Sequence, residues 1–217
     1  MNLCSIVVIF VSQIVVSLCF KDIPPRKDGA LTARYIVHNS DYTSISTVSS
    51  IPSIAGYPFV SITSISDGPV QNGTGVTYMY LPEIDFTGMD VEKDNRVSLM
   101  MSLIEGNYCT DNKYDPEDPR CSHVMMSGRF VKVKNGTEEH KFAQDTLFQR
   151  HPIMSSWPAD HGFFIAKVDF EFIAVQDMFG GPLIVKPADY FAVTPKQLYK
   201  YKNKLLRSNI HYSVNRI

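Results

Sequence analysis

The stretch FFIAKVDFEFIAVQ at residues 163–176, followed by GGP at 180–182, decides the class of fold. Its positions alternate between two faces, one made by Val168, Phe170 and Phe172 and the other by Asp169, Glu171 and Ile173. A period of two is typical of a β-strand. Gly180 and Gly181 then predict a tight turn that needs positive φ. The phenylalanines could line a small apolar pocket, but at strand spacing they are more often core: Phe163, Phe164, Phe170 and Phe172.

Upstream segments repeat this pattern and predict about six strands. Alternating or buried β-branched runs lie at 43–50, 59–66, 76–81, 96–105 and 123–134. Helical spacing predicts helices at 30–39, at 86–95 as a polar crossover, and at 137–149, which Thr137 would cap. Phe142, Leu147 and Phe148 would pack the last helix. Strands with few helices predict a mainly β (α+β) chain, a closed barrel with peripheral helices.

The amino terminus predicts a cleaved secretory signal at residues 1–19. Met1 to Phe20 carry no charged side chain, and two apolar runs lead to the small residues Ser17 and Cys19. The alternative is an uncleaved membrane anchor, but Ser12 and Gln13 interrupt a stretch that would need about 20 apolar residues to span a bilayer. We therefore expect a chain that enters the lumen and carries no membrane anchor.

Size and charge limit the partners of the remaining chain. About 200 residues suffice for one domain with a sizeable core. The full chain has 21 basic and 22 acidic residues, a balance that argues against a nucleic-acid partner. The carboxyl-terminal stretch 196–217 is basic with no acidic residue, so it either touches an anionic surface or is a solvated tail or loosely docked helix.

Cysteines and glycosylation sequons are consistent with the lumen. Loss of the signal leaves Cys109 and Cys121, which should pair in an oxidising compartment and contribute roughly 3 kcal/mol. A zinc site with His123 and a pair of free thiols are the alternatives, but the zinc site lacks a fourth ligand at usual spacing. Asn72 and Asn135 begin Asn-Gly-Thr sequons in turn-like sequence, and we expect both to be glycosylated.

Several short motifs together carry a family resemblance over roughly residues 31–193. They are TARY at 32–35, SDGP at 66–69, NYC at 107–109, LFQRHP at 147–152, SWP at 156–158 and FGGP at 179–182. In this order and spacing the chain resembles the CREG family of secreted "cellular repressor" glycoproteins. The resemblance implies an FMN-binding split barrel like that of pyridoxamine phosphate oxidases, and a homodimer built by barrel packing. It also implies a secreted or endolysosomal glycoprotein of growth control and differentiation that does not use flavin.

The expected organisation is therefore a signal peptide (1–19), an extension (20–30), the split-barrel domain (31–195) and the basic tail (196–217). Flavin-binding split barrels often carry a serine and a His-Thr-any-Asn run before the strand that matches residues 96–99. Here Pro82 stands at the serine position, and the run becomes Thr87, Gly88, Met89 and Asp90. Acidic groups repel a phosphate. Since 82–99 offers only Lys93 and Arg96 as cations, we expect no FMN.

Other catalytic and metal sites are not indicated by the sequence. It contains no nucleophile elbow, Walker loop or zinc-protease motif. His151 and His161 flank Trp157 and could form a metal or acid–base pair, although structural loop histidines are the simpler interpretation. We expect no catalytic residue, no metal and no cofactor.

Three functional hypotheses remain. The first is a non-enzymatic dimer that binds a receptor or other protein, with Tyr108, residues 111–120 and residues 179–182 as candidates for recognition. Phe179 could instead belong to the core. The second is a flavin- or haem-handling oxidoreductase on the same barrel. The third is a trafficking component recognised through its glycans.

Overall fold

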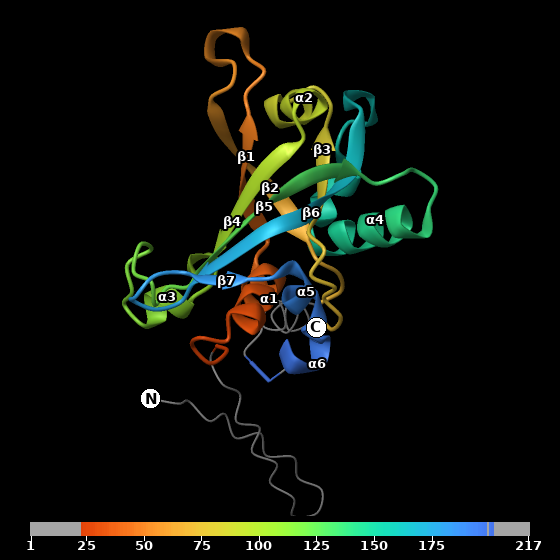
Figure 1. Ribbon diagram of the computed structural model, residues 1–217. Helices are drawn as coiled ribbons and strands as arrows, with labels where there is room; N and C mark the ends of the chain where they lie inside the picture. The colour runs from red at the N-terminus through yellow and green to blue at the C-terminus, as the bar shows by residue number, and fades with distance from the viewer. Residues whose placement is uncertain (1–22, 199, 202–217) are drawn as a thin grey trace, which may run out of the picture.

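The computed structural model describes residues 23–198 and 200–201 as an antiparallel sheet rolled into a barrel (Figure 1). Its strands are β1 (Tyr42–Val48), β2 (Pro58–Ser66), β3 (Tyr78–Pro82), β4 (Arg96–Ser102), β5 (His123–Lys132), β6 (Phe163–Gln176) and β7 (Leu183–Val185). They run in the order β3-β2-β1-β4-β5-β6-β7, and pairing of β3 with β6 closes six strands into a ring. This confirms the expected closed barrel. The expected signal peptide and residues 202–217 of the tail lie outside the described residues.

The helices are α1 (Gly29–Asn39), α2 (Phe86–Lys93), α3 (Tyr108–Asp111), α4 (Glu138–Arg150), α5 (Pro187–Ala192) and α6 (Pro195–Leu198). Short 3₁₀ turns are η1 (Pro52–Ile54), η2 (Leu103–Glu105), η3 (Pro152–Ser156) and η4 (Ala159–His161). The strand expected over 96–105 ends at Ser102, because the Ser102 hydroxyl accepts from the Ile104 amide and starts η2. Within the described residues, no helix has the length and apolarity needed to cross a membrane.

A β-bulge in β6 overturns one expectation. Ser127 pairs with Phe172 and Gly128 with Phe170, so Glu171 is an extra residue in β6. The bulge reverses the alternation: Phe170 and Ile173 face the core, whereas Phe172 is 45% exposed. Placing Phe172 on the face of Phe170 was therefore wrong. A Cβ at Gly128 would lie 2.1 Å from the Asp169 carbonyl oxygen, so this close approach requires glycine.

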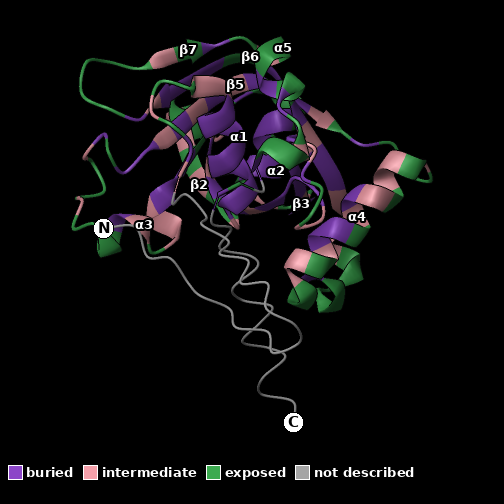
Figure 2. Cartoon of the chain, turned by 90° about the horizontal axis from the view of Figure 1, so that it is seen from below, coloured by how far each residue is buried: buried purple, intermediate pink, exposed green. Residues whose placement is uncertain are grey.

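Helix α1 closes the lower end of the barrel (Figures 1 and 2). Its N-cap is Asp28, whose carboxylate accepts from the Leu31 amide at 3.2 Å. Every residue from 31 to 39 is buried, more than the single packing face that helical spacing indicated. The start of the expected tail also packs here: Leu198 and Tyr201 are buried, and the Tyr201 ring lies 6.0 Å from that of Tyr35.

Helix α4 packs on the outside of the barrel and forms a second, smaller core. Thr137 is its N-cap, as expected, and accepts from the His140 amide at 3.1 Å. Tyr78 and Tyr80 share the outer face of β3, where their rings meet Phe142 at 6.0 Å and Phe148 at 5.4 Å. The predicted packing face of this helix is thereby confirmed, with Leu147 fully buried in the same cluster.

Candidate functional site

The structure joins Cys109 and Cys121 in a disulfide with an S–S distance of 2.01 Å. Both cysteines are fully buried, Cys109 in the short helix α3 and Cys121 just before β5. Pairing removes the alternative of a zinc site with His123. Within the part of the chain that the structure describes, no group of three or more His, Cys, Asp and Glu side chains could hold a metal ion.

The disulfide braces a cluster that we call the Arg120 patch, defined as Tyr108, Tyr114, Arg120 and Phe179, in which the two tyrosines are half-buried and Arg120 and Phe179 are exposed. The Arg120 guanidinium carbon lies 4.5 Å from the Tyr114 ring centroid and 5.8 Å from that of Phe179. The Tyr108 and Tyr114 rings are 6.1 Å apart. Phe179 is 68% exposed, so its alternative assignment to the core was wrong. Recognition candidates that are far apart in the sequence thus meet in one place.

Backbone conformation presents Phe179 outward. Gly180 and Gly181 follow it with φ of 116° and 98°, values that favour glycine, as the turn prediction required. The loop leads into β7, which pairs with β6 and, among the described strands, stands at the end of the sheet order. The aromatic ring therefore projects from a short, constrained turn beside the disulfide loop.

The rim of the Arg120 patch is acidic. Asp111, Asp115 and Glu117 are exposed along the disulfide loop. Arg120 donates from Nε to Asp118 Oδ1 at 3.0 Å, and its hydrogen bonds lower the pKa of Asp118 to about 2. An exposed ring beside acidic side chains can take a protein segment that carries apolar and basic groups, since aromatic residues and arginine are enriched at such contacts.

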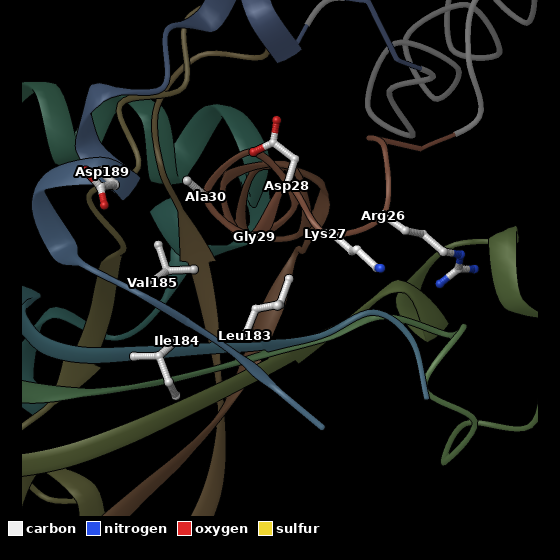
Figure 3. A pocket seen from close by; sticks show the side chains of 9 residues that line it. All are labelled: Arg26, Lys27, Asp28, Gly29, Ala30, Leu183, Ile184, Val185 and Asp189. Carbon is white, nitrogen blue, oxygen red and sulfur yellow. The ribbon is translucent and has the colours of Figure 1, made fainter. Parts of the chain in front are cut away.

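A hollow lies beside the Arg120 patch, between the start of α1 and β7 (Figure 3). Arg26 connects the two, because its Nη2 donates to the Arg120 carbonyl oxygen at 3.5 Å. The sticks in Figure 3 show charged side chains along one wall and aliphatic side chains of β7 along the other. The lining residues are Arg26, Lys27, Asp28, Gly29, Ala30, Leu183, Ile184, Val185 and Asp189.

The region that the sequence comparison placed at the flavin phosphate site, residues 82–90, is built around the start of α2. Asp85 caps this helix, and its carboxylate accepts from the Gly88 amide at 2.6 Å. A helix amino terminus is where a phosphate would bind, and here the chain's own carboxylate takes that place. Gly88 is packed so tightly that a Cβ would lie 2.4 Å from the Pro82 carbonyl oxygen, and Thr87 is buried.

Asp90 has a structural role that the sequence did not predict. It is fully buried and accepts hydrogen bonds from the Thr47 hydroxyl at 2.7 Å, the Ser50 amide at 2.6 Å and the Ser50 hydroxyl at 2.8 Å. Burial alone would raise its pKa, but these hydrogen bonds outweigh it and lower the pKa of Asp90. The carboxylate thus ties α2 to the end of β1 instead of facing a ligand.

Two cations near α2, Arg96 and Lys132, form ion pairs with acidic side chains. Arg96 donates from Nε to Asp94 Oδ1 at 2.9 Å, and Lys132 binds both Glu92 and Glu83. Of the two cations noted in the sequence, Lys93 is exposed at the last turn of α2. A dianionic FMN phosphate does not fit these residues, because the helix amino terminus carries Asp85 and the adjacent buried charge is negative.

His151 and His161 do not form a pair. His151 Nε2 lies 2.9 Å from the Ile65 carbonyl oxygen, and burial lowers the pKa of this histidine. The His161 ring instead stacks on Phe163 with centroids 6.2 Å apart. Each ring serves a separate structural contact, which agrees with the interpretation of structural loop histidines.

One buried polar network escaped the sequence analysis. Arg34, His38, Asp67 and Arg150 meet beneath the segment that carries Asn72. Three of the quoted motifs, at 32–35, 66–69 and 147–152, supply Arg34, Asp67 and Arg150, and His38 follows one turn after the first motif. The available signal was a pair of ionisable residues, Arg34 and His38, one turn apart in a helix that carries no other Arg, Lys, His, Asp or Glu. The two sequon asparagines themselves, Asn72 and Asn135, are exposed.

Comparison with known proteins gives consistent matches. The family model described as "CREG, beta-barrel" matches residues 24–192. The chain is 46% identical to protein CREG1 of Mus musculus over 172 residues, covering 79% of this chain and 77% of the relative. It is 40% identical to human CREG1 with the same coverage. It is 36% identical to human CREG2 over 174 residues, covering 80% of this chain and 59% of that protein.

Solved structures extend the similarity at the level of the fold. A haem-binding protein from Mycobacterium smegmatis superposes with a TM-score of 0.62 at 14% identity, covering 78% of this chain and 62% of that chain. A Clostridium acetobutylicum protein of the pyridoxinephosphate oxidase family gives 0.50 at 11% identity, covering 74% and 96%. These neighbours confirm the expected split-barrel fold.

Proposed function

The chain belongs to the CREG family, and from this premise we propose that it is a non-enzymatic, secreted or endolysosomal N-glycoprotein. It acts as a homodimer that binds a receptor or another protein, in growth control and differentiation. The observation that carries the binding function is the Arg120 patch. Its side chains come from two segments, a disulfide closes the loop that carries Tyr114 and Arg120, and the Phe179 ring from the second segment is left 68% exposed.

The chemistry of the patch favours a partner segment with apolar and basic side chains. Phe179 offers an aromatic face, and three exposed carboxylates surround the disulfide loop. Aromatic residues and arginine in a constrained surface often dominate binding energy. Truncation of one such residue typically costs more than about 1 kcal/mol of binding, or about a fivefold loss of affinity.

Binding of the purified, labelled glycoprotein to responsive cells tests this proposal. The wild type should bind saturably and be displaced by unlabelled protein. Phe179→Ala should weaken binding at least fivefold, whereas Tyr57→Ala, which truncates a similarly exposed ring at 66% exposure elsewhere, should not. Equal affinity of Phe179→Ala and wild type would refute the patch as the binding site. Loss of binding only in the Asn72→Gln, Asn135→Gln double variant would favour recognition through glycans.

The outer face of the barrel supports the proposed homodimer. Strand registers place outward residues of β2, β1, β4, β5 and β6 in two rows, and neither row contains a charge. The rows are Ile62, Ser44, Met100, Met125 and Ala174, and Val60, Ser46, Ser98, Ser127 and Phe172. The exposed apolar side chains of these rows, Val60, Ile62, Met100 and Phe172, form the kind of surface that is typical of an interface.

Ile62→Lys tests the dimer directly, because Ile62 is 70% exposed at the edge of this face. Sedimentation velocity should show a dimer for the wild type and a shift toward monomer for Ile62→Lys. Ile153→Lys is the matched control, since Ile153 is 69% exposed on η3. A monomeric wild type, or identical sedimentation of Ile62→Lys and wild type, would contradict this mode of assembly.

A flavin enzyme is the weaker candidate. The neighbour from Mycobacterium smegmatis is a haem-binding protein by its own description, but similarity at 14% identity extends only to the fold. In this chain the capped amino terminus of α2 and the buried carboxylate of Asp90 support a barrel that no longer holds FMN.

A further inference from the structure

His38 is a buried histidine whose two ring nitrogens both face hydrogen-bond acceptors. Nδ1 lies 2.8 Å from Asp67 Oδ1, and Nε2 lies 2.9 Å from the Val70 carbonyl oxygen. A neutral imidazole has a single N–H, so either tautomer would leave a lone pair pointing at an oxygen. The imidazolium form has two N–H donors and is the form that satisfies both contacts.

The segment that His38 holds is the 68–75 loop, which carries Asn72. Arg34, one turn earlier on α1, donates to the carbonyl oxygens of Gly73 at 2.7 Å and Thr74 at 2.8 Å. The loop lies directly on the histidine, because a Cβ at Gly73 would be 2.3 Å from His38 Nδ1. The loop therefore has two side-chain anchors on α1, one permanently charged and one titratable.

The charged groups that face His38 come from several elements. Asp67 is fully buried, and attraction by His38, Arg150 and Arg34 outweighs burial and lowers its pKa. From α4, Arg150 donates to Asp67 Oδ1 at 3.3 Å and to the Ser40 carbonyl oxygen at 2.9 Å. The outer titratable groups of this network are Tyr190, whose ring lies under the Arg34 guanidinium, and His151, which interacts electrostatically with Arg150 and Asp41.

We propose that protonated His38 is a clasp that fixes the 68–75 loop to α1, and that loss of its proton releases the Val70 carbonyl and loosens the loop. The Asp67 contact can survive in the tautomer protonated at Nδ1, whereas Nε2 then repels the carbonyl oxygen. Arg34 keeps its bonds to Gly73 and Thr74 at any pH, so the change is confined to the loop. This switch does not depend on the proposed binding function.

The protonation state can be read directly from the wild-type protein. Long-range ¹H–¹⁵N correlation spectra of ¹⁵N-labelled protein distinguish an imidazolium from each neutral tautomer. At about pH 5 both His38 nitrogens should give imidazolium shifts, because each faces an oxygen acceptor. At about pH 8 the spectrum should be that of a neutral tautomer. A neutral His38 at the lower pH, or an imidazolium at both, would overturn the proposal.

Hydrogen exchange tests the release of the loop. The Asn72 and Thr74 amides, bonded to the Pro69 and Asp67 carbonyls, are the probes. After correction for intrinsic rates, their exchange should be about five to ten times faster at the higher pH, the factor expected for one net hydrogen bond. His38→Gln should exchange fast at both values, and His140→Gln, on α4, should behave as the wild type. Equal protection of the wild-type loop at the two pH values would refute the clasp, even if His38→Gln did not fold.

Discussion

Replacing Asp90 tests whether its carboxylate fixes the junction of α2 with the β1 end. In Asp90→Ala the hydroxyl of Thr47 and the amide and hydroxyl of Ser50 lose their acceptor inside the protein. All three groups donate to a carboxylate whose residue is fully buried. Removing the acceptor leaves them unsatisfied, and each buried unsatisfied group costs about 1–3 kcal/mol. Since water will reach some of them, we expect the free energy of unfolding to fall by about 3–5 kcal/mol.

Asp90→Asn should cost much less. Its carbonyl oxygen can accept from the Ser50 amide and hydroxyl, while its NH₂ group donates to the Thr47 hydroxyl, which can turn and accept. We expect a loss of about 1–2 kcal/mol, mainly the difference between charged and neutral hydrogen bonds. The order Asp90→Ala, then Asp90→Asn, then wild type is therefore the signature of a structural carboxylate.

Urea unfolding followed by circular dichroism measures these differences, with Asp160→Ala on the exposed turn η4 as a control that should lie within about 0.5 kcal/mol of the wild type. Because the native pKa of Asp90 is lowered, its carboxylate stabilises the fold fully above the unfolded value of about 3.9. The advantage over Asp90→Asn should shrink as the pH falls below that value. An Asp90→Ala cost under about 1 kcal/mol would refute the reasoning.

Three further predictions concern stability. The double variant Cys109→Ser, Cys121→Ser should lower the free energy of unfolding by about 3 kcal/mol, because the unfolded chain regains the entropy of a loop whose ends are 12 residues apart. Equal urea midpoints for the wild type and the double variant would contradict this prediction. Gly128→Ala should destabilise by more than about 2 kcal/mol in the same assay, since its Cβ would meet the Asp169 carbonyl; a cost below 1 kcal/mol would mean that the bulge yields easily. Because the pKa of Asp67 is lowered in the folded protein, the wild type should lose stability as the pH falls below about 4. When the unfolding midpoint is measured as a function of pH, Asp67→Asn should be less stable than the wild type at neutral pH and should approach it in acid.

Strand and helix patterns predicted the barrel well because most of its elements obey simple periodicity. The strand at 163–176 has the predicted bounds, and the helix capped by Thr137 packs the predicted side chains. Phe172 was misplaced because a bulge depends on the partner strand, which a single segment does not encode. The three-residue strand β7 and the short helices α3, α5 and α6 are set by tertiary packing and leave little periodic signal.

The candidate site was predictable in its parts and not in its assembly. The residues of the Arg120 patch were singled out as exposed loop candidates, but only the closed sheet shows that Phe179 lies over Arg120. Asp90 was interpreted by its charge, as a group that repels phosphate, because burial and three hydrogen bonds are invisible in the sequence. The Arg34 and His38 network likewise depends on segments that are about 30 to 110 residues apart.

The measurement that tests the central claim most directly is an absorbance spectrum of the protein secreted from its expression host, repeated after incubation with excess FMN and gel filtration. We predict that the protein elutes as a dimer. We also predict no flavin band in either sample, because Asp85 caps the amino terminus of α2 and Asp90 is a structural carboxylate. A stoichiometric yellow cofactor that stays with the protein would contradict this account and make an oxidoreductase the leading function.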